Sequence, residues 1–289
     1  SWLPSYQKQV EETISRLLEE RYRSFSDPSE SLFADAIKHA VSAGGKRLRP
    51  VFSMITYEYI KKESTPEILL ESMVGIEMIH AYSLVHDDLP CMDNDDFRRG
   101  KPTVWKQYGE TLAVLVGDGL QSYGIELLAR SRNPDILLEV ARNIGDFGMV
   151  RGQLRDMLLD QGEISLDELF RLHDEKTGAI IATSFSLGAR LAGATNDTVD
   201  VFRRFGILLG RAFQLQDDIL DFEGTLQQLG KRGGKDIELG KGIVSKIGID
   251  CSKKLLSDME NELILLLKNH EITDQKFFDM IYFVIHRSV

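Results

Sequence analysis

The chain has 289 residues, of which 43% are apolar and 28% charged, as is typical of a soluble globular protein. Its formal net charge of -10 argues against a nucleic-acid binder or a protein of anionic membranes, because both need a basic surface. Two cysteines without CxxC spacing, Cys91 and Cys251, indicate neither a zinc site nor a disulfide framework. The amphipathic start, Ser1 to Ser31, and the lack of a run of roughly 18 apolar residues predict no leader peptide, no stable membrane insertion and a cytoplasmic location.

Helical periodicity dominates the sequence. Apolar residues recur at spacings of three and four, and alternation with a period of two is scarce. We therefore predict an all-α fold in a single domain, 1–289, because no linker and no shift in composition divides the chain. The predicted helices cover residues 5–23, 31–43, 50–61, 66–87, 109–130, 135–159, 165–175, 177–193, 197–222, 243–269 and 273–287.

Local signals mark several helix starts and one loop. Thr65-Pro66, Asn133-Pro134 and the pair Ser165 and Glu168 fit helix N-termini. The Gly- and Lys-rich segment 224–242 is predicted to be a mobile loop.

The first candidate site is a basic turn, GGKRLRP at residues 44–50, which precedes an apolar helix. Taken alone, such a turn is more often a helix connection than a phosphate site. His80 lies two helical turns before Asp87 on nearly the same face, so we expect it to point toward the same site. The two readings of His80 are a hydrogen-bonded core residue and a diphosphate contact.

The first aspartate cluster is interrupted by a proline. On a continuous helix Asp87 and Asp93 would point about 240° apart. Pro90 predicts that the helix ends near Asp88 and that a turn brings Asp93 beside Asp87. The alternative is a solvated acidic loop. The basic segment 97–103 follows directly, and Mg²⁺ is usually held by carboxylates together with substrate phosphate, which arginine also binds.

The second aspartate cluster forms a helical stripe, because Gln214, Asp217, Asp218 and Asp221 occupy positions i, i+3, i+4 and i+7. A stripe that faces water is the alternative, but no Lys or Arg between Gln214 and Asp221 pairs with it and its flanks are apolar. Carboxylates in apolar sequence are costly unless a cation neutralises them. The two clusters therefore predict divalent metal ions shared between facing helices, and a site for a polyanion.

The motifs GGKRLRP, HAYSLVHDDLPCMDNDDFRRGKPT, GQLRDM, HDEKTGAII and FQLQDDILDFEGT occur in this order. Over residues 44–241 the chain resembles the short-chain trans-polyprenyl diphosphate synthases, specifically the bacterial farnesyl diphosphate synthase (geranyltranstransferase) type. The resemblance implies about ten or more helices around a central cavity, and a homodimer. It also implies the Mg²⁺-dependent condensation of isopentenyl diphosphate with dimethylallyl or geranyl diphosphate to (2E,6E)-farnesyl diphosphate.

The resemblance assigns roles by motif match. It implies about three Mg²⁺ ions, held by Asp87, Asp88, Asp93, Asp217, Asp218 and Asp221. Isopentenyl diphosphate would be bound by Lys46, Arg49, His80 and Arg99, and the allylic diphosphate by Arg98, Lys176, Lys241 and Lys231 or Lys235. The implied catalytic set is Lys176, Thr177, Gln214, Asp87 and Asp217.

Tyr82 and Ser83 are the candidate chain-length residues. Tyr82 lies five residues before Asp87, about 7 Å deeper along the helix. In the family an aromatic ring here goes with products that stop at C15, and the alternative is a plain core aromatic. The segment 241–245 departs from the family's Lys-x-Thr-Tyr-Pro, which leaves the register of Lys231 and Lys235 open.

Two rival functions differ in their motifs. A class I terpene cyclase usually lacks the second aspartate motif and the GGKRLR turn. A non-catalytic partner subunit of a heteromeric prenyl synthase tends to lose aspartates, whereas all six motif aspartates are present here.

Overall fold

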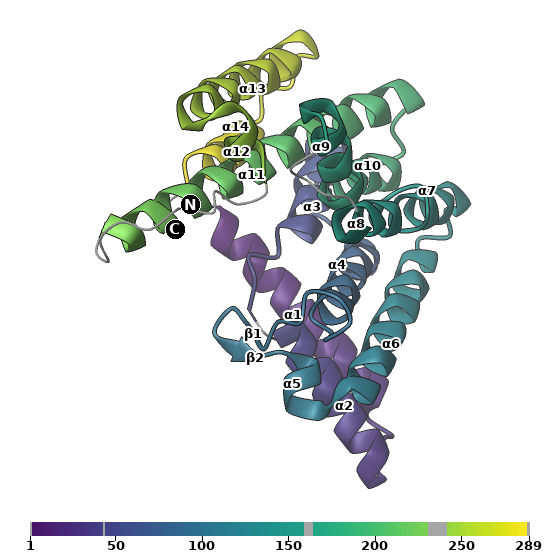
Figure 1. Ribbon diagram of the computed structural model, residues 1–289. Helices are drawn as coiled ribbons and strands as arrows, with labels where there is room; N and C mark the ends of the chain where they lie inside the picture. The colour runs from purple at the N-terminus through teal and green to yellow at the C-terminus, as the bar shows by residue number, and fades with distance from the viewer. Residues whose placement is uncertain (1, 43, 159–163, 231–241, 288–289) are drawn as a thin grey trace. The chain divides into compact units, whose positions relative to one another are not determined.

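The computed structural model describes residues 2–42, 44–158, 164–230 and 242–287. Most of these residues are helical, which confirms the predicted all-α class (Figure 1). The chain forms two compact units. Unit 1 contains Ser1–Leu138 and Leu187–Ala194, and unit 2 contains Glu139–Ser186 and Thr195–Val289. The single domain over 1–289 stays a prediction.

Unit 1 is built around one helix that is buried on every side. Its elements are α1 (Leu3–Tyr22), α2 (Pro28–Ser42), α3 (Leu48–Lys61), α4 (Glu67–Asp87), β1 (Phe97–Arg98), β2 (Lys101–Pro102), α5 (Val104–Tyr108) and α6 (Glu110–Ala129). Helix α4 packs against α1, α2, α3 and α6. Because neighbours surround it, α4 is apolar all round rather than along one stripe.

Helices α4 and α6 approach closely at two glycines. A Cβ atom on Gly75 would lie 2.7 Å from the carbonyl oxygen of Gly124, and one on Gly124 would lie 2.7 Å from that of Gly75. Any larger residue at either position would push the helices apart. The two glycines therefore set how α4 lies against α6.

Helices α4 and α6 also have the length and apolar composition of a membrane-spanning helix, with window hydropathies of 1.4 and 1.2. The interior of the protein buries 72% of the α4 window and 44% of the α6 window. Buried core helices meet the same criterion, so this finding does not indicate a membrane protein.

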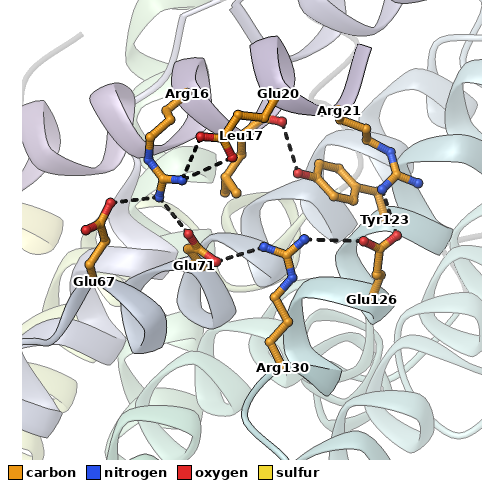
Figure 2. Close-up of polar contacts among 9 residues, drawn as sticks. All are labelled: Arg16, Leu17, Glu20, Arg21, Glu67, Glu71, Tyr123, Glu126 and Arg130. Atoms are coloured by element: carbon orange, nitrogen blue, oxygen red, sulfur yellow. Dashed lines mark hydrogen bonds and ion pairs between the residues drawn. The ribbon is translucent and has the colours of Figure 1, made fainter. Parts of the chain in front are cut away.

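An ion-pair network joins α1, α4 and α6 at the N-terminal end of α4 (Figure 2). Glu71 accepts hydrogen bonds from Arg16 at 2.7 Å and from Arg130 at 2.8 Å. Arg130 also pairs with Glu126, which pairs with Arg21. Glu71 is the only one of these five residues that is buried. One carboxylate therefore holds an arginine from each of the two neighbouring helices.

Unit 2 is organised along one long helix. Its elements are α8 (Met149–Leu158), α9 (Leu166–His173), η1 (Asp174–Gly178), α11 (Asn196–Gly230), α12 (Ile243–Ile247), α13 (Ile249–Asn269) and α14 (Gln275–Ile285), together with α7 (Pro134–Ile144) from Glu139 onward and α10 (Ala179–Leu191) as far as Ser186. Helices α9, α12, α13 and α14 and the π-helical turn η1 pack against α11. The aromatic core contains four fully buried rings, Phe185, Phe202, Phe205 and Phe277.

Glycines break two helices that periodicity predicts to be continuous. The predicted helix 135–159 is wrong, because a turn at Gly145 and Gly148 separates α7 from α8. The predicted helix 243–269 is wrong in the same way, because Gly248 adopts a φ of 81° between α12 and α13. The predicted loop 224–242 is wrong for residues 224–230, which continue α11, and residues 231–241 lie outside the described chain.

Two of the three predicted helix starts are confirmed. Ser165 and Glu168 form a capping box at the start of α9. Asn133 accepts a hydrogen bond from the Asp135 backbone N–H at 3.0 Å. Thr65 does not cap α4, whose N-cap is Pro66, since the Thr65 side chain bonds to Glu58 instead.

We expect Glu71→Gln to lower the free energy of unfolding by about 1–2 kcal/mol, between the values for exposed and buried ion pairs, because both arginine partners are partly exposed. Urea denaturation measures the change. The control is Glu12→Gln, which removes an exposed pair with Lys8 at 3.7 Å and should change stability by less than about 0.5 kcal/mol. Equal effects of both variants would contradict a special role for Glu71.

Candidate active site

The first aspartate motif forms the end of α4 as predicted. Asp87 is the last residue of the helix and Asp88 is its C-cap. The chain then turns back, and the Asp93 backbone N–H donates to the Asp87 carbonyl at 2.8 Å. The predicted return of Asp93 to Asp87 after Pro90 is confirmed at the level of the backbone.

Within this motif the aspartates differ in their surroundings. Asp87 is half-buried and Asp93 is exposed. Asp88 is buried and accepts hydrogen bonds from Arg98 Nε at 2.9 Å and Nη2 at 2.6 Å. Burial raises the pKa of Asp88, and the Arg98 hydrogen bonds oppose that rise. Asp88 therefore anchors Arg98, while Asp87 and Asp93 are the more accessible carboxylates.

A tight hairpin brings the two basic motifs of unit 1 together. Strands β1 and β2 pair through a turn at Arg99 and Gly100, whose φ values of 51° and 76° are typical of a type I′ turn. The Arg99 guanidinium donates to the Gly44 carbonyl, and Lys101 Nζ donates to the Ser42 carbonyl at 3.1 Å. A side chain at Gly45 would clash with Arg99, since its Cβ would lie 2.6 Å from Nη1. Both glycines of the basic turn thus accommodate the hairpin.

Arg47, which sequence reasoning missed, holds the basic turn to the core. Its side chain is buried, and its backbone adopts a left-handed φ of 48°. The guanidinium donates to Glu11 at 2.6 Å, to Glu77 at 3.0 Å and to the Val41 carbonyl at 2.6 Å. The turn that carries Lys46 and Arg49 is therefore fixed from below by a residue that faces away from solvent.

His80 lies among arginines. Its pKa falls well below the usual value, first because of burial and then because of the positive charges of Arg49, Arg99, Arg98 and Arg47. The imidazole is thus neutral at pH 7, and it offers one N–H donor rather than a positive charge. Burial also lowers the pKa of Arg49 to about 10, which leaves it charged at neutral pH. The charges of Arg49, Arg98 and Arg99 thus act on His80, and the diphosphate-binding roles of these residues stay predictions.

Tyr82 is a buried aromatic residue on α4. Its ring is 6% exposed and packs edge-on against His86, with ring centroids 5.8 Å apart. Burial raises the pKa of Tyr82, and a hydrogen bond with Gln121 opposes that rise. The Ser83 hydroxyl donates to the His80 carbonyl at 2.8 Å, within the same helix. The roles of Tyr82 and Ser83 in chain length stay predictions.

In unit 2, Lys176 and Thr177 lie on the π-helical turn η1. Such turns are rare and are often found at functional sites, because one extra residue per turn redirects the side chains. Asp174 binds Arg211 of α11 through two hydrogen bonds of 2.7 and 2.6 Å, and Lys176 pairs with Asp156. Gln214 lies about one turn beyond Arg211 on α11. No sequence signal predicted the π-helical turn.

The second aspartate motif has partners that sequence reasoning also missed. Arg287 Nη2 donates to Asp217 at 2.5 Å, and its guanidinium stacks over Phe213 at 3.8 Å. Asp218 accepts a hydrogen bond from the Ile243 backbone N–H at 2.8 Å. Burial raises the pKa of Asp218 to about 6, and the nearby charges of Asp221 and Asp217 add to that rise. Asp218 therefore anchors the start of α12, and its metal role stays a prediction.

The donor chemistry of both motifs fits a hard divalent cation. They offer carboxylate oxygens, and the crowding of Asp217, Asp218 and Asp221 is relieved by a positive charge. In the described parts of the chain, however, no three His, Cys, Asp or Glu side chains gather closely enough to hold a metal ion. Lys231, Lys235 and Lys241 lie outside the described residues. The pairing of the two motifs around shared ions stays a prediction.

Comparison with known proteins decides the family. The family model described as polyprenyl synthetase matches residues 30–269. The chain belongs to this family. A similar solved structure, the FPP/GFPP synthase from Zymomonas mobilis, has a TM-score of 0.81 and 29% identity, with 98% of each chain covered.

Two curated relatives of the family carry different product names. The geranylgeranyl pyrophosphate synthase of Capsicum annuum is 39% identical over 79% of this chain. The alignment spans 64% of that relative's own length, which is less than two thirds. The farnesyl diphosphate synthase of Micrococcus luteus is 34% identical, with 90% of this chain and 91% of that protein covered. The family is therefore shown, whereas the product length is not.

We expect buried His173 to make unit 2 sensitive to acid. Burial lowers its pKa to about 4, so the unfolded chain binds more protons between pH 6.5 and 4 and stability falls as the pH falls through that window. One such group changes the free energy of unfolding by at most about 1.4 kcal/mol per pH unit. His173→Asn should flatten the dependence of the melting temperature on pH between 7 and 4.5.

His270→Asn, which replaces an exposed histidine at the end of α13, is the matched control and should leave the pH profile unchanged. A His173→Asn profile parallel to that of the unsubstituted protein would contradict the assignment.

Proposed function

We propose that the protein is a prenyltransferase that condenses isopentenyl diphosphate with dimethylallyl or geranyl diphosphate to give (2E,6E)-farnesyl diphosphate. One observation carries the proposal: the GGKR turn and the RRGK hairpin, joined by a contact between residues 55 apart in sequence, meet beside His80 on the helix that ends in the first aspartate motif. Cations suited to a diphosphate and carboxylates suited to a divalent metal therefore lie at the same end of unit 1. This combination suits a substrate diphosphate better than either feature alone.

The reaction follows from the charges that these residues supply. The allylic C1–O bond breaks and its electron pair leaves with the diphosphate, which Arg98 and Lys176 stabilise as charge builds up. The double bond of isopentenyl diphosphate then supplies the pair for the new C–C bond. A proton lost from the isopentenyl unit restores a double bond, and the released diphosphate accepts it. Thr177 and Gln214 are proposed to face the cationic carbon with their oxygen dipoles.

Mg²⁺ is the proposed cofactor. The proposed ligands are Asp87 and Asp93 within unit 1 and, separately, Asp217 and Asp221 within unit 2, while Asp88 and Asp218 bond to Arg98 and to the start of α12. When bound, the metal supplies Lewis-acid stabilisation of the leaving diphosphate. Arg287 would have to give up its contact with Asp217 for that carboxylate to bind a metal ion.

Product length, assembly and location are further parts of the proposal. The bulky, buried ring of Tyr82 favours a C15 product. Exposed apolar side chains on α6, Val114, Leu115 and Ile125, favour a homodimer through that helix. We propose a cytoplasmic location for the enzyme, as the sequence analysis expects.

One assay tests the proposal directly. The purified protein is incubated with isopentenyl diphosphate, Mg²⁺, and either dimethylallyl or geranyl diphosphate, and the products are sized. Farnesyl diphosphate as the main product supports the proposal. Cyclised hydrocarbon would favour the terpene-cyclase alternative, and no elongation would favour a partner subunit.

Asp87→Asn and Asp217→Asn should each lower kcat at least about a hundredfold in saturating Mg²⁺, since each change removes a charged oxygen ligand. Steady-state rates measure the effect. The control is Asp197→Asn, an exposed aspartate in the first turn of the same helix as Asp217, which should keep its full rate. Rates close to those of the unsubstituted protein for either motif variant would refute the metal assignment.

Tyr82→Ala should shift the products beyond C15, because it removes a buried ring five residues below Asp87. Tyr82→Phe keeps the ring and should keep the C15 product. Chromatography of the dephosphorylated products measures both. An unchanged distribution with Tyr82→Ala would make Tyr82 an ordinary core aromatic.

A further inference from the structure

Glu77 is a carboxylate buried in α4 beneath the basic residues of unit 1. Its side chain is 6% exposed. One carboxylate oxygen, Oε1, accepts the hydrogen bond from Arg47 Nη1 at 3.0 Å. The other, Oε2, is buried and has no hydrogen-bond partner among the described residues. Burying a charged oxygen without a hydrogen-bond donor costs free energy. We therefore look for a reason for its presence other than the pair with Arg47.

The cations around Glu77 supply that reason. Arg49 Nε is also buried without a hydrogen-bond partner in the described chain. Burial lowers the pKa of both Arg49 and Arg99, and for both of them the negative charge of Glu77 opposes that fall. Arg47 and Arg98 add further positive charge around Arg99. Glu77 thus balances arginines from the basic turn and from the hairpin.

The spacing along α4 links Glu77 to His80, three residues later and about one turn further on. Because Glu77 is bonded to Arg47 through one oxygen, it holds the basic turn from below. Because it forms no hydrogen bond with Arg49 or Arg99, their charges are balanced at a distance while their donors are not consumed by it. An anion that binds above them then meets charged, correctly placed arginines.

We propose that Glu77 is the positioning residue of the isopentenyl diphosphate subsite, where it fixes the basic turn through Arg47 and balances the charge of Arg49 and Arg99. The identity of the substrate rests on the proposed function. The contacts and charges of unit 1 support a site in which two arginines and a neutral histidine bind a diphosphate. Glu77 would position the arginines of that site.

Glu71 provides a matched control within the same helix. Both glutamates are buried in α4 and both accept hydrogen bonds from arginine, but Glu71 belongs to the network at the other end of the helix (Figure 2). A purely structural role predicts similar behaviour for Glu77→Gln and Glu71→Gln. A positioning role predicts that only the first affects binding of isopentenyl diphosphate.

The experiment compares these two variants with the unsubstituted protein. We expect Glu77→Gln to raise KM for isopentenyl diphosphate about tenfold, as the loss of well-placed charged donors does, with KM for geranyl diphosphate within about twofold. Glu71→Gln should lower the melting temperature and leave both KM values within about twofold. An unchanged KM for isopentenyl diphosphate, or an equal rise in both KM values, would overturn the proposal.

A conservative variant covers the case in which Glu77→Gln does not fold. Glu77→Asp keeps the charge but shortens the side chain by one methylene. It should raise KM for isopentenyl diphosphate by a smaller factor, again without a change for geranyl diphosphate. Equal changes in the two KM values would count against the proposal in this variant too.

A binding measurement separates this inference from the proposed function. Inorganic pyrophosphate is titrated calorimetrically in metal-free buffer, where the cationic residues bind it without help from Mg²⁺. We expect about tenfold weaker binding in Glu77→Gln, or a smaller loss in Glu77→Asp, and no change in Glu71→Gln. Lack of turnover by the unsubstituted protein would refute the proposed function only, whereas equal pyrophosphate affinities would overturn the role of Glu77.

Discussion

The arrangement of unit 1 depends on a buried charge balance between Arg47 and Glu77. Several guanidinium groups placed together repel one another and lose hydration, so they gather only where carboxylates compensate them. Arg47 is buried, and it is held by Glu77, Glu11 and a backbone carbonyl. This one residue turns a flexible, glycine-rich segment into a fixed platform for Lys46 and Arg49. The hairpin that carries Arg98 and Arg99 then docks on that platform.

The position of this platform is well defined because α4 packs against neighbouring helices along its length. Neighbouring helices surround it, and the glycines at its crossing with α6 leave no room for sliding. The Glu71 network ties its N-terminal end to α1 and α6 (Figure 2). His80 and Asp87 therefore stand on the most constrained element of unit 1, although the motif that follows Asp87 is a loop. A rigid helix that ends at the reacting groups is how a fold preorganises binding.

The two aspartate motifs present similar carboxylate groups on different local structures. The first is a helix end closed by backbone hydrogen bonds, and it uses Asp88 to anchor an arginine. The second is a stripe within α11, where Asp218 anchors the next helix and Asp217 pairs with Arg287. In each motif one buried or half-buried aspartate, Asp88 or Asp218, bonds to a neighbouring segment of the scaffold. The sequence motifs do not distinguish these carboxylates, whereas their hydrogen bonds show that Asp88 binds Arg98, Asp217 binds Arg287 and Asp218 binds the start of α12.

The sequence by itself determined the features that depend on nearby residues. Pro90 ended α4 and returned Asp93 to Asp87, the 3.6-residue period placed the aspartates of α11 on one stripe, and Ser165 with Glu168 capped α9. The tertiary structure alone decided the contacts of Arg47 with Glu77, of Arg99 with Gly44 and of Arg287 with Asp217. The partners in these pairs lie 30 to 70 residues apart, so no local pattern identifies them. Proline, helical period and caps act within a few residues, whereas a buried ion pair forms only where packing brings distant segments together.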